Sequence, residues 1–245
     1  MASIENQRDE FWEEQMIRTI LFDLDNTLLN FNTAERIAVT KALQEAKVPV
    51  TEAVLCRYSQ LNLEQWKLLE KRQLTRAEVK VRRFRLLFEE LGSDASAENT
   101  AACYEKLLAI GHFFIEGAPE LLELLKGKYR MYLVTNGTKS VQDGRLASAG
   151  IRKYFEDVFI SEEIGFEKPF PEFFAYCFSR IPGFRKEETV IVGDSLTSDI
   201  QGGINSGIRT IWFQPSEKPV DSEIHPDYQI RHLLELPKLL DDIII

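Results

Sequence analysis

The chain has 245 residues, of which 44% are hydrophobic and 28% charged, as in an ordinary globular protein with its own apolar core. Its net charge of −9 argues against a nucleic-acid partner, because such proteins normally need a basic surface. An anionic substrate would need positive charge inside the site itself, from a metal ion or a well-placed lysine.

The cysteine count and the hydropathy pattern narrow the cellular setting. The three cysteines are far apart in the sequence, and no spacing typical of a zinc site is present. A sparse, odd count is typical of reduced thiols, so we expect a cytoplasmic protein. The first 15 residues are polar and charged rather than signal-like, and no apolar run approaches the ~20 residues that cross a bilayer. We expect no membrane partner, and either a monomer or a homodimer.

The first predicted element is a buried strand at residues 17–22, a mostly apolar run that ends in the sequence DLDNT. From Thr33 to about Phe114 glycine is scarce and apolar residues recur at helical spacing. The breaks in this pattern predict helices at 33–47, 51–71, 75–91 and 97–112.

After Gly117 strands and helices alternate, which indicates βαβ units around a parallel sheet. The predicted strands are 130–135, 157–160, 189–192, 209–213 and 228–230, and the predicted helices are 119–126, 139–149, 171–180, 198–206 and 231–240. The sequence therefore predicts an α/β core made of residues 1–31 and 114–245, with an inserted all-helical domain at 32–113.

The segment FDLDNTLL at residues 22–29 carries the strongest chemical signal. Side chains along a strand alternate, so Asp23 and Asp25 are expected on the same side of the chain. Two carboxylates this close repel each other, and a cation with oxygen ligands such as Mg²⁺ would resolve the repulsion. An aspartate-rich turn capped by Thr27 is the alternative interpretation.

Two further segments offer groups that bind phosphate. Thr135 is the last residue of a predicted strand, and its hydroxyl, together with the backbone N–H groups that follow it, can hold a phosphate oxygen. Lys168 precedes a proline, which favours an extended backbone and can aim the ammonium group into a cluster of carboxylates. Taken alone, an Asn-Gly turn and an exposed lysine explain these segments better.

The segment VGDSLTSD at residues 192–199 ends another predicted strand. Asp194 stands at the strand end and Asp199 follows a turn later, which fits a hard-metal site; an Asp/Ser helix cap is the alternative. All four segments lie at carboxyl ends of predicted parallel strands, where open α/β sheets place their sites. Together they favour one site over four unrelated turns.

In their order and their residues, the four segments resemble the motifs of the haloacid dehalogenase superfamily of phosphohydrolases. The resemblance covers essentially the whole predicted core. The helical insertion matches by position the superfamily's cap of the first type. DNTLLNF, GFEKPFPEFF and GDSLTSDIQGG are similar to the bacterial pyrimidine 5′-nucleotidases. The resemblance implies a Rossmann-like core with a helical cap. It also implies a Mg²⁺-dependent phosphomonoester hydrolase acting on a small phosphorylated metabolite, here a pyrimidine nucleoside monophosphate.

By this resemblance, Asp23 is a metal-bound nucleophile that forms an aspartyl-phosphate. Asp25 is the general acid that protonates the leaving alkoxide and then the base that activates water, and its backbone carbonyl binds Mg²⁺. Dehalogenases of the superfamily lack an aspartate at this position, so Asp25 favours phosphate esters as substrates.

The resemblance also implies roles for the remaining site residues. Thr135 and the Asn136 amide hold the phosphoryl oxygens, and Lys168 stabilises the charge on Asp23 and on the phosphate. Asp194 ligates Mg²⁺, and Asp199 orients Asp194 or a metal-bound water.

Several alternatives to a pyrimidine nucleotidase stay open: a phosphatase for sugar phosphates or other small phosphoesters, then a phosphomutase, then a non-catalytic binding protein. A cap can close over a site and select the substrate. Its candidate contacts are Phe31, Arg57, Tyr58 and Trp66, although packing inside the cap is favoured for Trp66. The basic run KVRRFR at residues 80–85 is interpreted as a solvated helix face.

Overall fold

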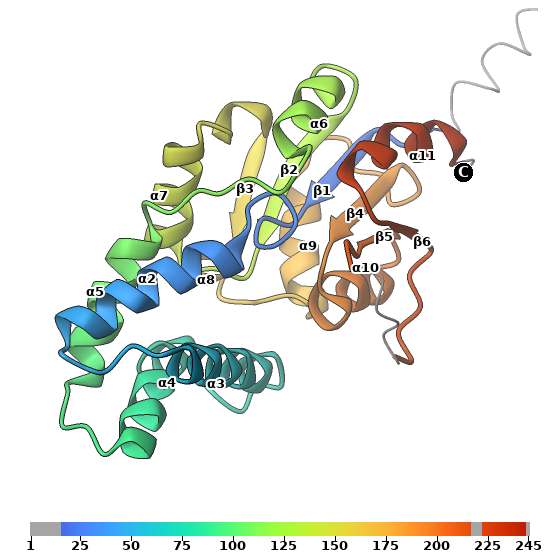
Figure 1. Cartoon of the computed structure of the whole chain (residues 1–245). Helices are drawn as coiled ribbons and strands as arrows, with labels where there is room; N and C mark the ends of the chain where they lie inside the picture. The colour runs from blue at the N-terminus through green and yellow to red at the C-terminus, as the bar shows by residue number, and fades with distance from the viewer. Residues whose placement is uncertain (1–15, 217–221, 244–245) are drawn as a thin grey trace, which may run out of the picture. The chain divides into compact units, whose positions relative to one another are not determined.

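The computed structural model describes residues 16–216 and 222–243 (Figure 1). The polar segment 1–15, for which the sequence predicts no secretion signal, lies outside the described residues. Among the residues that are described, no helix has both the length and the apolar character needed to cross a membrane.

The described chain forms two compact units. The α/β unit contains the described residues up to Leu29, Phe114–Asn136 and the described residues from Arg152 onward. The helical unit contains Asn30–Phe113 and Gly137–Ile151. The helical unit thus includes the predicted helix at 139–149 as well as the inserted segment. The division into a core of residues 1–31 and 114–245 and an inserted domain at 32–113 stays a prediction.

A six-stranded parallel sheet with strand order β3-β2-β1-β4-β5-β6 organises the α/β unit. Its strands are β1 (Thr19–Phe22), β2 (Arg130–Thr135), β3 (Asp157–Ile160), β4 (Thr189–Gly193), β5 (Arg209–Phe213) and β6 (Tyr228–Ile230). Its helices are α6 (Ala118–Leu125), α8 (Ser161–Ile164), α9 (Pro171–Arg180), α10 (Gln201–Ser206) and α11 (Leu236–Asp242), with short helical turns η1 (Arg152–Tyr154), η2 (Leu196–Ile200) and η3 (Leu233–Glu235).

The register brings the carboxyl ends of the central strands to one edge. Phe22, the last residue of β1, pairs with Leu133 of β2 on one side and Val192 of β4 on the other. The chain runs from β1 outward to β3 and then crosses to β4, so the strand order reverses between β1 and β4. Open α/β sheets bind ligands at such a reversal, outside the carboxyl ends of the strands.

Helices α9 and α10 pack closely against the sheet. Phe173 and Phe174 of α9 are fully buried in a cluster with Leu21 of β1 and residues of β2 and β4. Gly203 of α10 lies so near β5 that an added Cβ would approach the Thr210 Cγ2 atom to 2.5 Å. Because Gly203 has no side chain, α10 can lie directly against β5.

The helical unit packs its amphipathic helices around an aromatic core. Its helices are α2 (Phe31–Glu45), α3 (Glu52–Glu70), α4 (Arg76–Leu91), α5 (Ala97–Leu108) and α7 (Lys139–Ala149). Tyr58, Phe84 and Tyr104 meet with ring centroids 5.0 to 5.8 Å apart. The α4 helix begins with a capping box between Thr75 and Glu78, which satisfies backbone N–H groups that the helix leaves open.

The basic run at 80–85 is only partly a solvated face, so that interpretation is wrong for its centre. Arg83 and Phe84 are buried, because the α4 helix turns them toward the interior. Arg83 lies 4.6 Å from the Tyr104 ring centroid and donates to the Asn62 Oδ1 atom at 2.6 Å. Asn62 in turn donates to Glu35 at 2.6 Å, so one amide links two buried charges.

Three of the candidate cap contacts have partners inside the helical unit. Tyr58 is fully buried, half-buried Arg57 is paired with Glu90 at 2.7 Å, and Trp66 carries the Arg76 guanidinium 5.6 Å from its ring. A role in substrate recognition stays a prediction for these residues.

The predicted α/β class, with a parallel core and a helical insertion after the first strand, is confirmed. The element limits differ locally. Strand β1 begins at Thr19 rather than residue 17, and the helix predicted at 231–240 is divided into η3 and α11. Pro237 causes the division, because it has no N–H to donate and fits only the first turn of a helix.

Candidate active site

Asp23 is the first site residue along the chain, and it directly follows the last residue of β1. Its N–H still donates to the Val192 carbonyl of β4 at 2.9 Å, so the sheet fixes its backbone. The chain then turns tightly, with Asn26 at a φ of 61°, a conformation that asparagine tolerates better than most residues. The turn returns the Thr27 hydroxyl to the Asp23 Oδ2 atom at 3.1 Å.

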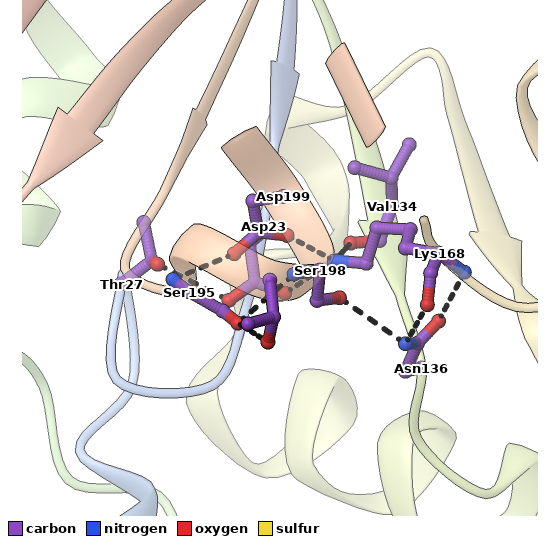
Figure 2. A network of polar contacts seen from close by, with 9 residues as sticks. Asp23, Thr27, Val134, Asn136, Lys168, Ser195, Ser198 and Asp199 are labelled. Atoms are coloured by element: carbon purple, nitrogen blue, oxygen red, sulfur yellow. Dashed lines mark hydrogen bonds and ion pairs between the residues drawn. The ribbon is translucent and has the colours of Figure 1, made fainter. Parts of the chain in front are cut away.

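Lys168 is the centre of the charge network, and only 1% of its surface is exposed. Its ammonium group donates to the Asp23 Oδ1 atom at 2.7 Å, the Asp199 Oδ1 atom at 2.6 Å and the Val134 carbonyl at 2.8 Å. Figure 2 shows this side chain reaching between the two carboxylates. All three ammonium hydrogens therefore have acceptors, and the interpretation of an exposed lysine is wrong.

Asn136 holds the backbone of Lys168. Its amide nitrogen donates to the Lys168 carbonyl and its amide oxygen accepts from the Lys168 N–H, both at 2.8 Å. The same amide nitrogen donates to the Ser198 hydroxyl at 3.2 Å (Figure 2). The Asn136 side chain thus positions the lysine, whereas the role predicted for this residue concerns its backbone amide.

Asp199 enters the site because Gly193 leaves room for it. A Cβ at Gly193 would lie 2.3 Å from the Asp199 carboxylate, a separation that real atoms do not adopt. The second oxygen of this carboxylate accepts the Ser195 N–H at 3.0 Å. One carboxylate therefore joins the Lys168 ammonium group to the loop after β4.

Asp23, Asp194 and Asp199 form a carboxylate cluster, with one oxygen from each lying within 4.8 Å of the others. When ionised, they carry three negative charges against the one positive charge of Lys168. The all-oxygen donor set and the excess charge of −2 fit a hard divalent cation such as Mg²⁺.

The pKa values reflect this charge excess. Burial raises the pKa of Asp23 to about 7 against the opposing effect of Lys168, with Asp199 and Asp25 adding to the rise. Burial, then repulsion from Asp23 and Asp199, raises the pKa of Asp194 well above its usual range. Burial alone would lower the pKa of Lys168, but Asp199 and Asp23 outweigh it and raise that pKa above its ordinary value. The lysine is therefore charged, and the aspartates are short of positive charge.

The structure brings Asp23, Lys168, Asp194 and Asp199 together, and Asn136 joins them through the Lys168 backbone. The predicted roles of these residues stay predictions.

Two other predicted site residues lie near the same strand ends. Thr135 is buried as the last residue of β2, and Asp25 is half-buried in the turn after Asp23. Their predicted roles also stay predictions.

Sequence reasoning missed several contacts that shape the site. Ser195 and Ser198 stand inside the GDSLTSD segment, so the motif itself offered a signal for them. The Trp212 indole, which donates to the Asp194 carbonyl at 2.8 Å, lies on a strand that carries no motif. Only the fold reveals that contact.

Comparison with known proteins identifies the family. A family model described as haloacid dehalogenase-like hydrolase matches residues 17–207. The chain belongs to this family. The predicted membership is thereby confirmed, and so is the prediction of a hydrolase.

Among the relatives of this haloacid dehalogenase-like hydrolase, a HAD-hydrolase named YfnB from Bacillus subtilis is 41% identical over 224 residues, covering 91% of this chain and 95% of that protein. The pyrimidine 5′-nucleotidase PynA of Streptococcus pneumoniae is 39% identical, covering 91% and 94%. The N-acylneuraminate-9-phosphatase of Homo sapiens is 30% identical, covering 93% and 95%.

A crystal structure of YfnB has the same fold, with a TM-score of 0.88 at 40% identity, and the similarity covers 92% of this chain and 99% of that one. It is described as bound to magnesium and as revealing interdomain movement.

Proposed function

We propose that this hydrolase is a Mg²⁺-dependent phosphomonoesterase in which Asp23 carries the phosphoryl group as an aspartyl-phosphate. The observation that carries the proposal is the cluster in which one ammonium group is bonded to buried Asp23 and Asp199 and an oxygen of half-buried Asp194 converges with theirs. The YfnB structure, described as bound to magnesium, supports the choice of cation.

Asp23 is the nucleophile in this proposal. Lys168 holds its Oδ1 atom at 2.7 Å, while the Oδ2 atom has only the longer 3.1 Å bond from Thr27. We therefore assign the attack on phosphorus to Oδ2. When bound, Mg²⁺ would neutralise carboxylate charge and draw electron density from the phosphoryl group; Asp23, Asp194 and the Asp25 carbonyl would hold it.

Asp25 moves the proton in both half-reactions. As the bond from phosphorus to the ester oxygen breaks, Asp25 donates a proton to the departing alkoxide. It then takes a proton from the water that attacks the phosphorus of the aspartyl-phosphate. Inorganic phosphate leaves, and the Asp23 carboxylate is restored.

Thr135 and the Asn136 backbone amide bind the transferring group, and the positive charge of Lys168 stabilises it. Phosphoryl transfer depends chiefly on positioning and on stabilisation of the equatorial oxygens. Thr135 is held by β2, and the Lys168 ammonium group is fixed by three acceptors. A hydroxyl and a positive charge that are held in place in this way need no rearrangement during the reaction. Asp199 keeps Lys168 in place and orients the loop that carries Asp194.

The substrate we favour is a pyrimidine nucleoside monophosphate. The relative named pyrimidine 5′-nucleotidase PynA, at 39% identity over nearly the full chain, supports this choice. The relative named N-acylneuraminate-9-phosphatase favours a phosphorylated sugar acid as the second candidate. A cytoplasmic location and a monomeric or dimeric state remain predictions.

Phosphate release from a substrate panel tests the proposal. The panel contains dUMP, UMP, dTMP, purine nucleotides, sugar phosphates, phosphoglycolate and N-acylneuraminate 9-phosphate, each with Mg²⁺ and with EDTA. We expect kcat/KM to be highest for the pyrimidine nucleotides, with no release in EDTA. Preference for the sugar acid would keep the mechanism and replace the substrate. Absence of release from every ester, or release in EDTA, would contradict the mechanism.

A further inference from the structure

One peptide unit beside the carboxylate cluster is held at both ends. The Asp194 carbonyl accepts the indole N–H of Trp212 at 2.8 Å. The N–H of the same peptide, which belongs to Ser195, donates to the Asp199 Oδ2 atom at 3.0 Å, and Figure 2 shows this second contact. Rotation of the peptide plane would break two hydrogen bonds at once.

We propose that Trp212 is a positioning residue that fixes the direction of the Asp194 carboxylate and thereby sets the affinity for Mg²⁺. The inference rests on the proposed function, because it needs Asp194 to be a ligand. The direction of the Asp194 carbonyl and the torsion between that carbonyl and Cα determine where the side chain leaves the backbone. Holding the carbonyl therefore restricts the directions that the carboxylate can take, without touching it.

The sheet explains why support is needed at this position. Strand β4 ends at Gly193, whose partner on β5 is Trp212 itself. Asp194 lies one residue beyond the paired region, where the ladder no longer constrains its backbone. Because Trp212 lies beside the last residue of β4, its indole can reach the Asp194 carbonyl. The rigid ring places its single N–H donor at a defined point.

The Trp212 contact differs from the purely structural polar contact on the same strand. Two residues earlier, the Thr210 hydroxyl donates to the Asp227 carboxylate at 2.8 Å and accepts the Asp227 N–H at 2.9 Å. That pair joins β5 to the segment before β6 and has no contact with the carboxylate cluster. Thr210→Val is therefore a matched control that removes buried hydrogen bonds of β5 but leaves Asp194 alone.

Calorimetric titration with MgCl₂, without substrate, tests the proposal on the full-length wild-type, Trp212→Phe and Thr210→Val proteins. Loss of one hydrogen bond predicts a roughly three- to tenfold weaker Mg²⁺ affinity for Trp212→Phe. Thr210→Val should have a lower Tm but an unchanged Mg²⁺ affinity. In phosphatase assays, Trp212→Phe should need more Mg²⁺ for half-maximal rate and recover at saturating Mg²⁺.

The outcomes distinguish the role of Trp212 from the proposed metal chemistry. Equal Mg²⁺ affinity of wild type and Trp212→Phe would overturn the role of Trp212 alone. An equal loss of affinity in Thr210→Val would overturn it too, because the effect would then come from general loosening. Failure of the wild-type protein to bind Mg²⁺ would overturn both the proposed metal chemistry and this inference. If Trp212→Phe does not fold, replacing Trp212 by its benzothiophene isostere, which keeps the shape but lacks the N–H, makes the same comparison.

Discussion

At the scale of single residues, the site is governed by a shortage of positive charge. Lysine is usually exposed, yet Lys168 is buried with three acceptors around its ammonium group. The burial is tolerated because the neighbouring carboxylates compensate the charge. They in turn are undercompensated, and a divalent cation would relieve the repulsion between them.

Asp23→Asn tests both the chemistry and the charge at this scale. The change is nearly isosteric but removes the nucleophile, so we expect kcat to fall at least about 10³-fold with an unchanged circular dichroism spectrum. Retained turnover would exclude Asp23 as the nucleophile.

The same variant should be more stable than wild type in EDTA at pH 8. The Asp23 pKa is raised to about 7 in the folded protein, so between about pH 4 and pH 7 the folded state binds more protons than the unfolded state. Stability contributed by the protonated carboxyl is therefore lost as pH rises through this window. Thermal unfolding from pH 5 to 8 measures the effect, with the exposed Asp94→Asn as control. A lower Tm of Asp23→Asn at pH 8 would contradict the prediction.

At the scale of elements, glycines at β4 and α10 determine how closely the segments approach. Gly193→Ala would place a Cβ 2.3 Å from the Asp199 carboxylate and displace it from Lys168. A shift of about 1 Å costs about 10²-fold in rate, so we expect a loss of this order in kcat. Gly203→Ala is the matched control, because its Cβ would meet Thr210 at 2.5 Å without touching the site. It should lose about 1–3 kcal/mol of stability and keep its kcat. Equal rate losses in both variants would contradict the argument.

The buried polar link within the helical unit makes a second prediction at this scale. Asn62 bonds both Glu35 and Arg83 at 2.6 Å. Asn62→Ala leaves each buried charge without that partner, so we expect the free energy of unfolding, measured with urea, to fall by about 3 kcal/mol. Arg85→Ala, which breaks the exposed pair with Glu98, should change it by less than about 1 kcal/mol. Similar losses in the two variants would show that the buried link adds nothing beyond a surface pair.

At the scale of the whole molecule, a cation that binds only the folded cluster must stabilise the protein. At a Mg²⁺ concentration 100-fold above the dissociation constant, mass action contributes about 2.7 kcal/mol. For a chain of this size, that raises Tm by about 5–10 °C. Differential scanning calorimetry in MgCl₂ and in NaCl of equal ionic strength measures the shift, and Asp194→Asn should reduce it. A shift of the same size in NaCl would assign it to screening of the net charge.

The α/β class, the helical insertion and the candidate residues Asp23, Lys168 and Asp194 could all be predicted from the sequence. These properties follow from short-range patterns: apolar periodicity marks strands and helices, and the polar residues at strand ends identify one edge of a parallel sheet. Asp23, Lys168 and Asp194 could be selected in this way before any contact was visible.

How those residues are held depends on contacts that form only in the folded chain. These contacts join segments far apart in the chain. They are the three acceptors around Lys168, the hydrogen bonds of Asn136 to the Lys168 backbone, the contacts of buried Arg83, and the indole of Trp212 on the Asp194 carbonyl. A local pattern carries no information about such pairs, because the energy of a buried polar group depends on which partner the fold brings within hydrogen-bonding distance.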